Sequence, residues 1–137
     1  MVATDAQGIP ISSIIDTAQK GEARIGVGVI DLLSKRERGK IVELTADRGY
    51  DSKRFRKAMY NRGIKPRVPK QRRYRQKHVK IMKIVTKTYR QRWVVERTFA
   101  WVQNFRRLVV RWDRSASMFN AFLIFALIVL CIGKLLK

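Results

Sequence analysis

Two carboxylates within a strongly basic stretch are the side chains best suited to chemistry. Asp47 directly follows an apolar segment, residues 41–46, which is predicted to be a strand. In α/β proteins, the carboxyl end of a strand is where ligand-binding and catalytic groups gather. Glu96 lies between Val95 and Phe99 in a predicted helix. We therefore expect Glu96 on an inward face, where a carboxylate needs a cationic partner or a metal ion.

Each of these carboxylates also has a simpler structural interpretation. Asp47 can form a turn, and Glu96 can pair with Arg92, four residues earlier. The chain has one His, His78, and one Cys, Cys131, so clusters of His or Cys metal ligands and an internal disulfide are excluded. Any metal would be held by carboxylates, which favours Mg²⁺ or Mn²⁺.

The charge of the chain indicates a polyanionic partner. Its 137 residues include 31 Lys and Arg against 10 Asp and Glu, a formal net charge of +21. Most of the basic residues follow residue 34, and residues 53–87 are the densest region, which includes Lys70, Arg72 and Arg73. Nucleic acid is the predicted partner. A solvated basic face and an anionic membrane surface are the alternatives.

The order of predicted elements is typical of an α/β fold. Residues 9–15 are predicted to be the second strand of a hairpin, residues 17–33 a weak helix and residues 35–40 a charged loop. A helix is expected from Asp51 or Ser52 to about Asn61, closed by Gly63, and residues 64–68 form an extended piece. Residues 84–112 have a helical pattern. That spacing assigns four aromatic residues to the core, with base stacking as the alternative: Trp93, Phe99, Trp101 and Phe105.

The last predicted helix, residues 117–137, is strongly apolar. Its uncharged apolar run, residues 121–132, spans about 18 Å, or about 22 Å when extended to Met118, against about 30 Å of bilayer core. We therefore expect a helix packed in the core and no membrane association. The chain opens without a basic, apolar leader, so the expected location is the cytoplasm, at the nucleoid.

Two motifs resemble those of known proteins. Residues 45–51, TADRGYD, followed by a helix and a Gly-Ile-Lys-Pro turn, resemble the ADKGYDS block of insertion-sequence DDE transposases. Tyr89, Arg92 and Glu96 resemble the Y-R-E-K signature of the insertion-sequence-four/five superfamily. Residues 5–10, DAQGIP, and 104–108, NFRRL, also fit that group, so the resemblance covers essentially the whole chain.

The resemblance implies an RNase H-like fold in which three acids hold two divalent metals, Mg²⁺ or Mn²⁺, and cut and join DNA phosphodiesters. Asp47 would be the second acid and Glu96 the third, both as catalytic metal ligands. Tyr89 and Arg92 would contact transposon-end DNA or orient the Glu helix. Gln103 stands where the signature has Lys, so it keeps hydrogen bonding but loses charge. Arg106 and Arg107 are expected to face phosphate or solvent.

The first acid of the signature has no counterpart in this sequence. Asp5 aligns with the hairpin turn, and Asp16 is no better placed. We therefore expect residues 1–137 to be an N-terminally truncated catalytic domain that is inactive alone, with the missing strand supplied by an upstream-frame transposase half. Transposon ends, target DNA and further copies of the chain are the expected partners. The alternative is a non-catalytic basic nucleic-acid-binding protein.

Overall fold

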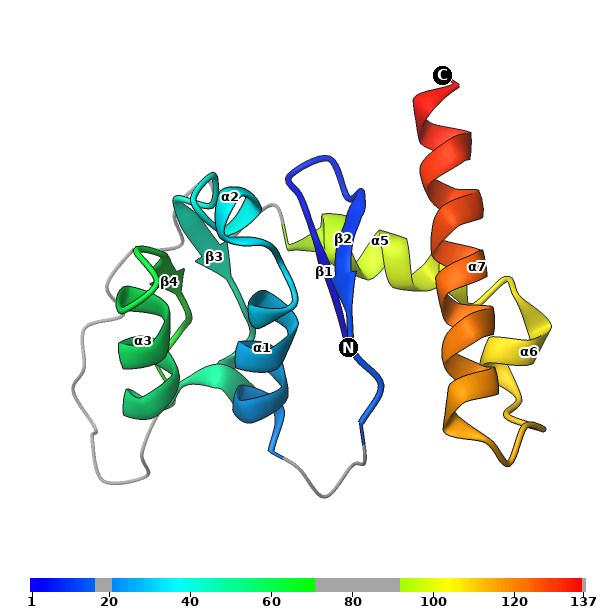
Figure 1. Cartoon of the computed structure of the whole chain (residues 1–137), viewed down its shortest axis with the longest axis horizontal. Helices are drawn as coiled ribbons and strands as arrows, with labels where there is room; N and C mark the ends of the chain where they lie inside the picture. The colour runs from blue at the N-terminus through cyan, green and yellow to red at the C-terminus, as the bar shows by residue number, and fades with distance from the viewer. Residues whose placement is uncertain (17–20, 71–91, 137) are drawn as a thin grey trace. The chain divides into compact units, whose positions relative to one another are not determined.

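The computed structural model describes residues 1–16, 21–70 and 92–136, which belong to two units (Figure 1). The terminal unit combines Met1–Thr17 with Trp93–Lys137, and the central unit is Ala18–Arg92. Both contain helices and strands, so the predicted α/β class is confirmed. The described strands form two sheets of two strands each, one antiparallel and one parallel.

The central unit is built around a β-α-β arrangement. Strand β3 pairs in parallel with β4, with Leu44 opposite Pro66, and helix α3 connects them (Figure 1). Helix α1 contacts α3, and α3 contacts β4. The core contains Ile30, Phe55, Met59 and Ile64. The elements are α1 (Glu22–Asp31), α2 (Lys35–Arg38), β3 (Glu43–Thr45), the 3₁₀ turn η1 (Arg48–Tyr50), α3 (Lys53–Tyr60) and β4 (Lys65–Arg67).

Helix α3 begins and ends where its sequence predicts. The Ser52 hydroxyl accepts a hydrogen bond from the Phe55 N–H at 3.1 Å, which satisfies one free donor of the first turn. Phe55 and Met59, four residues apart, form its buried stripe. Gly63 then takes a φ of 72°, which a side chain disfavours, and lets the Ile64 N–H bond the Met59 carbonyl.

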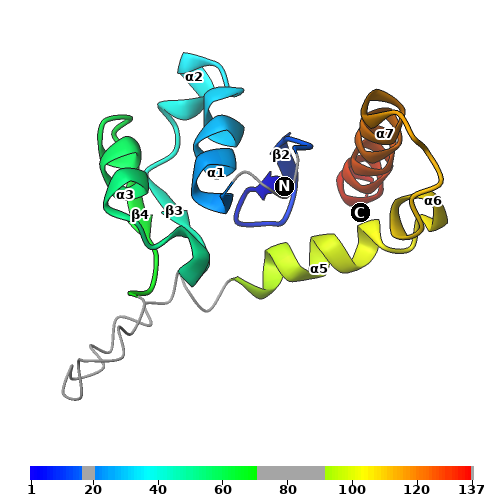
Figure 2. The ribbon, with the colours of Figure 1, turned by 90° about the horizontal axis from the view of Figure 1, so that it is seen from below.

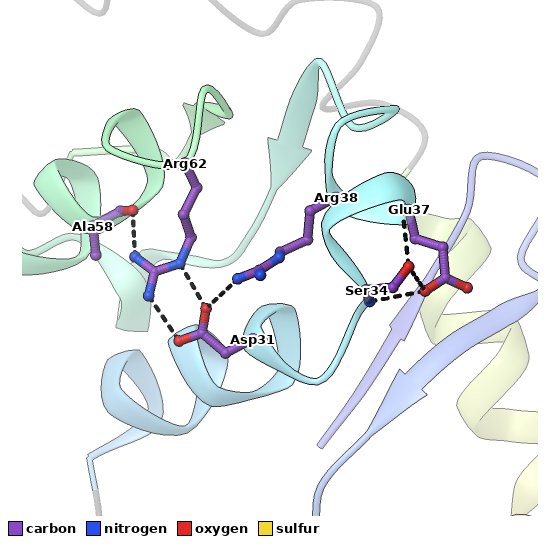
Figure 3. A network of polar contacts seen from close by, with 6 residues as sticks. All are labelled: Asp31, Ser34, Glu37, Arg38, Ala58 and Arg62. Carbon is purple, nitrogen blue, oxygen red and sulfur yellow. Dashed lines mark hydrogen bonds and ion pairs between the residues drawn. The ribbon is translucent and has the colours of Figure 1, made fainter.

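The charged segment predicted as a loop at residues 35–40 contains a short helix instead. Ser34 and Glu37 form a capping box: the Ser34 hydroxyl accepts from the Glu37 N–H, and the Glu37 carboxylate accepts from the Ser34 N–H (Figure 3). The Ser34 hydroxyl also donates to Glu37 Oε2 at 2.6 Å, and this bond, together with the one from the Ser34 N–H, holds the pKa of Glu37 below its usual value. The Ser-x-x-Glu spacing was the available signal for this start.

Asp31 ties three helix ends of the central unit together. Its carboxylate accepts from Arg38 Nη1 at 2.9 Å and from Arg62 Nε and Nη2 at 2.8 and 2.7 Å. Arg62 Nη1 also donates to the Ala58 carbonyl (Figure 3). The cluster therefore joins the last residue of α1 to α2 and to the end of α3.

The terminal unit opens with the predicted hairpin. Strands β1 (Val2–Thr4) and β2 (Pro10–Ser13) pair antiparallel. In the turn, one Asp5 carboxylate oxygen accepts from the N–H groups of Gln7 and Ile9. Gly8 has a φ of 81°. A Cβ there would also collide with Val94, so this close approach requires glycine.

The prediction of one continuous helix over residues 84–112 is wrong within the described residues. The structure has α5 (Trp93–Val102), a turn, and α6 (Arg106–Val109), while residues 84–91 lie outside the described residues. Val94, Thr98 and Val102 form the buried row of α5. Trp93 is 52% exposed and Phe99 is also exposed, so their assignment to the core is wrong. Both lie on α5 outside the buried row.

Helix α7 (Ala116–Leu135) contacts β2, α5 and α6, and Figure 2 shows α6 beside it. Leu123, Ala126 and Leu127 are buried. Its 20 residues correspond to about 30 Å, so the expectation that this segment is too short for a bilayer is wrong. By length and composition alone, α7 is able to cross a membrane. Core helices of soluble proteins meet the same two criteria.

Candidate catalytic and DNA-binding residues

Asp47 lies at the carboxyl end of β3. The strand ladder continues to the Ala46 N–H, which bonds the Arg67 carbonyl. Asp47 then caps η1, because its Oδ1 accepts from the Arg48 N–H at 2.6 Å. Its side chain is 61% exposed. The turn-forming and functional interpretations are thus compatible, since a capping carboxylate at this position stays accessible.

Asp47 also forms an ion pair with a residue of the second motif, within the central unit. Arg92 Nη1 donates to Asp47 Oδ1 at 3.1 Å. The two motifs that define the resemblance, 45 residues apart in sequence, therefore meet at one ion pair. The pairing of Arg92 with Glu96 stays a prediction.

A further acid near Asp47, Glu22, was missed by sequence reasoning. Glu22, at the start of α1, lies against Gly49, where an added Cβ would collide with its carboxylate. The pKa of the Tyr50 hydroxyl is raised to about 12, chiefly by burial and further by the negative charges of Glu22 and Asp47. No spacing in the sequence signals this, because packing of α1 against η1 brings Glu22 there.

Glu96 lies in the terminal unit, in the first turn of α5, and is exposed. The expectation of an inward-facing carboxylate is wrong, because Val94 and Thr98, two residues to either side, occupy the buried row. Asp47 and Glu96 belong to different units, so their meeting at one site stays a prediction.

The carboxylates have the right chemistry for a hard divalent cation, since Mg²⁺ and Mn²⁺ prefer oxygen ligands. Among residues 1–16, 21–70 and 92–136, however, no group of three or more acidic, His or Cys side chains is placed to hold a metal. Asp47 Oδ1 is also already engaged by Arg48 and Arg92. The described residues therefore do not form a complete metal site by themselves.

Besides Arg92, which bonds Asp47, the predicted DNA-binding residues fall into three groups. Tyr89, Arg72 and Arg73 lie outside the described residues. Lys70, Gln103 and Arg106 are exposed. Arg107 is exposed as well, but its guanidinium lies 4.1 Å from the Phe122 ring centroid and 3.3 Å from Asp113 Oδ1, so it is held in place by the protein.

Comparison of the whole sequence with known protein families agrees with the motifs and with the α/β architecture. Residues 1–131 match the family described as the transposase DDE domain. The chain therefore belongs to the DDE transposase family. It is 35% identical over 136 residues to a Burkholderia cepacia protein whose name assigns it to insertion sequence element IS402 as a transposase.

That alignment takes in 95% of the present chain and 60% of the relative, so the chain spans about three fifths of the length of this curated relative. No solved structure shows significant similarity.

Proposed function

We propose that this chain supplies the second and third catalytic acids of a DDE transposase with an RNase H-like core, and that the whole protein moves a DNA element. The family match over residues 1–131 is the observation that carries the proposal. The position of Asp47, exposed at the carboxyl end of a parallel strand, supports it, because a phosphodiester can reach the carboxylate there.

In this proposal Asp47 and Glu96 are the residues that hold Mg²⁺ or Mn²⁺. The chemistry such ions supply is activation of the attacking oxygen and stabilisation of the leaving oxygen during in-line attack. Arg92 would exchange the Asp47 carboxylate for a DNA phosphate, and Tyr89 would contact the same DNA. The exchange suits Arg92, because a guanidinium bonds carboxylate and phosphate oxygens equally well.

DNA binding follows from the charge. A net charge of +21 favours a polyanion, and Lys70 and Arg106 offer exposed cations that can neutralise phosphates. Gln103 would contribute a hydrogen bond without charge. These features also suit a protein that binds nucleic acid and does not cut it, and the family match supports the transposase instead.

We further propose that the remaining portion of a complete transposase supplies the first acid. The relative extends well beyond the aligned region, which leaves room for another strand and another carboxylate. The active form would be an assembly with that portion and with further copies of the chain, working on the nucleoid in the cytoplasm.

A cleavage assay tests this. The chain is incubated with transposon-end DNA and Mg²⁺, alone and with a polypeptide corresponding to the part of the IS402 relative outside the alignment. We expect cleavage only in the mixture, and its loss in Asp47→Ala and Glu96→Ala. Glu37→Gln is the matched control, since that exposed acid caps α2.

Two results would contradict the proposal. Cleavage by the chain alone that Asp47→Ala abolishes would show that no further acid is needed. Cleavage by the mixture that survives Asp47→Ala would remove this residue from the site.

A further inference from the structure

Helix α7 is apolar on all sides, yet the described residues of the terminal unit cover only one side of it. Between Phe119 and Gly133 it has no charged residue. Leu123, Ala126 and Leu127 are buried on the side that contacts β2, α5 and α6. Helices that are apolar all round are normally buried all round, in a large core or in a bilayer.

The uncovered side is a continuous apolar stripe, here called the outer face of α7. Its members are spaced seven, three, four and three residues apart, so they lie in one row along the helix. Phe125 is 62% exposed and Leu135 75% exposed. Ile132 follows the buried Leu123 by nine residues, about two and a half turns, so the two lie on opposite sides. The outer face consists of Met118, Phe125, Ile128, Ile132 and Leu135.

The outer face is wider than the seam of a two-helix coiled coil. Ile124 and Val129 flank the row and are also exposed. A stripe that broad is typical of a helix packed into a domain core, whereas a two-helix seam is narrower. A large net charge on every copy, +21, further opposes pairing of two copies through this face.

The inner contacts of α7 hold it to the terminal unit along its length. Near its end, Lys134 Nζ donates to the Gln7 carbonyl at 2.6 Å and lies 5.0 Å from the Trp101 ring centroid. Near its start, Arg107 and Arg111 lie over the rings of Phe122 and Phe119. Crossing a bilayer would require the helix to leave all of these contacts, so a protein occupant fits better.

We propose that the outer face of α7 binds the portion of a DDE transposase that lies outside this chain, the remaining two fifths of an IS402-type protein. This rests on the proposed function and names the surface through which the two portions join. Among the described residues, the hairpin sheet beside α7 consists of β1 and β2 alone, so both strands are edge strands to which a further strand can be added. An added portion can extend that sheet and cover the helix together.

The test is a binding measurement with matched variants. The tagged chain is co-expressed with the untagged remainder of the IS402 relative, and capture and affinity are measured. Phe125→Asp and Ile128→Asp place a charge on the outer face and should each weaken binding at least about tenfold. Leu32→Asp makes a similar change at a residue that is 61% exposed in the central unit, and should alter affinity less than about twofold.

Fluorescence of an apolar-surface dye gives a second readout on the intact chain. The free chain should bind the dye, and either Phe125→Asp or addition of the remainder should reduce the signal. Circular dichroism checks that each variant keeps its helices. Because neither readout requires DNA cleavage, binding without cleavage would leave the docking surface intact and count against the catalytic assignment.

Other occupants of the outer face give distinct results that would overturn the proposal. Dimerisation of the chain that Phe125→Asp abolishes would identify a second copy. Partition into phosphatidylglycerol vesicles that the same variant abolishes would identify a membrane. Absence of dye binding by the free chain, or capture of the remainder unaffected by both outer-face variants, would show that this surface is not the interface.

Discussion

At the scale of single residues, an acid in this basic chain can hold several elements together by accepting hydrogen bonds from more than one arginine. Asp31 is 40% exposed, yet its two oxygens accept three hydrogen bonds from Arg38 and Arg62. Hydrogen bonding from Arg62 is the main reason that the pKa of Asp31 lies below its usual value, and the charges of both arginines add to it. An exposed pair alone contributes little, whereas a bidentate network anchored on three helix ends contributes more.

Asp31→Asn should therefore lower the free energy of unfolding by roughly 1 kcal/mol at pH 7, a value limited by solvent screening. Because the folded pKa is lowered, this stabilisation is present above the unfolded value, 3.8, and is lost as pH falls through the folded pKa. Urea unfolding of both proteins at pH 7 and at about pH 3 measures the difference, which should shrink at the lower pH. A constant difference would assign the effect to packing.

At the scale of elements, local signals predicted more than periodicity did. Ser52 and Gly63 fixed the ends of α3, and the turn after Asp5 fixed the hairpin, because cap and turn chemistry acts over a few residues. Periodicity failed after Val102, where α5 ends. Apolar residues on both sides of the turn at 103–105 keep a helical spacing, so the pattern cannot show that the helix has ended.

Two helical glycines give a matched test of element packing. Gly26 is buried in α1, and an added Cβ would lie 2.6 Å from Tyr50 Cε1, so Gly26→Ala should destabilise the central unit despite its better helix propensity. Gly133 in α7 has open space around it, so Gly133→Ala should stabilise its unit by about 0.5–1 kcal/mol. Thermal unfolding monitored by circular dichroism compares them. A stabilising Gly26→Ala would mean that α1 does not pack closely on Tyr50.

Gly8 makes a stricter case, because both its backbone and its surroundings demand glycine. Gly8→Ala would place a side chain at a φ of 81° and against Val94. The hairpin should therefore detach from α5, and the free energy of unfolding should fall by at least about 2 kcal/mol. Thr98→Ser, which keeps the hydroxyl that bonds the Gly8 carbonyl, should cost less than Thr98→Val. Equal losses would show that this hydrogen bond contributes nothing.

At the scale of the whole molecule, the site was predictable in part. The position of Asp47 at the end of a strand was predicted, because an acid after an apolar strand carries its own signal, and its catalytic role stays a prediction. The contact of Arg92 with Asp47 and the position of Glu22 were not predicted, since tertiary packing creates both. Several acids of the described residues are paired with arginines, including Glu43 with Arg67 and Asp51 with Arg56. The remaining positive charge is thus available to bind a polyanionic partner.

That excess should govern DNA binding. Each exposed cation that contacts a phosphate contributes about 0.9 to the slope of log affinity against log salt concentration. Lys70→Gln and Arg106→Gln should each lower the affinity for duplex DNA. Each should also reduce the magnitude of this slope by about 0.9, the contribution of one phosphate contact. Arg62→Gln removes the same charge from a guanidinium already held by Asp31, so its slope should stay unchanged. Fluorescence anisotropy from 50 to about 300 mM salt measures all three, and equal slopes for the three variants would place the DNA away from Lys70 and Arg106.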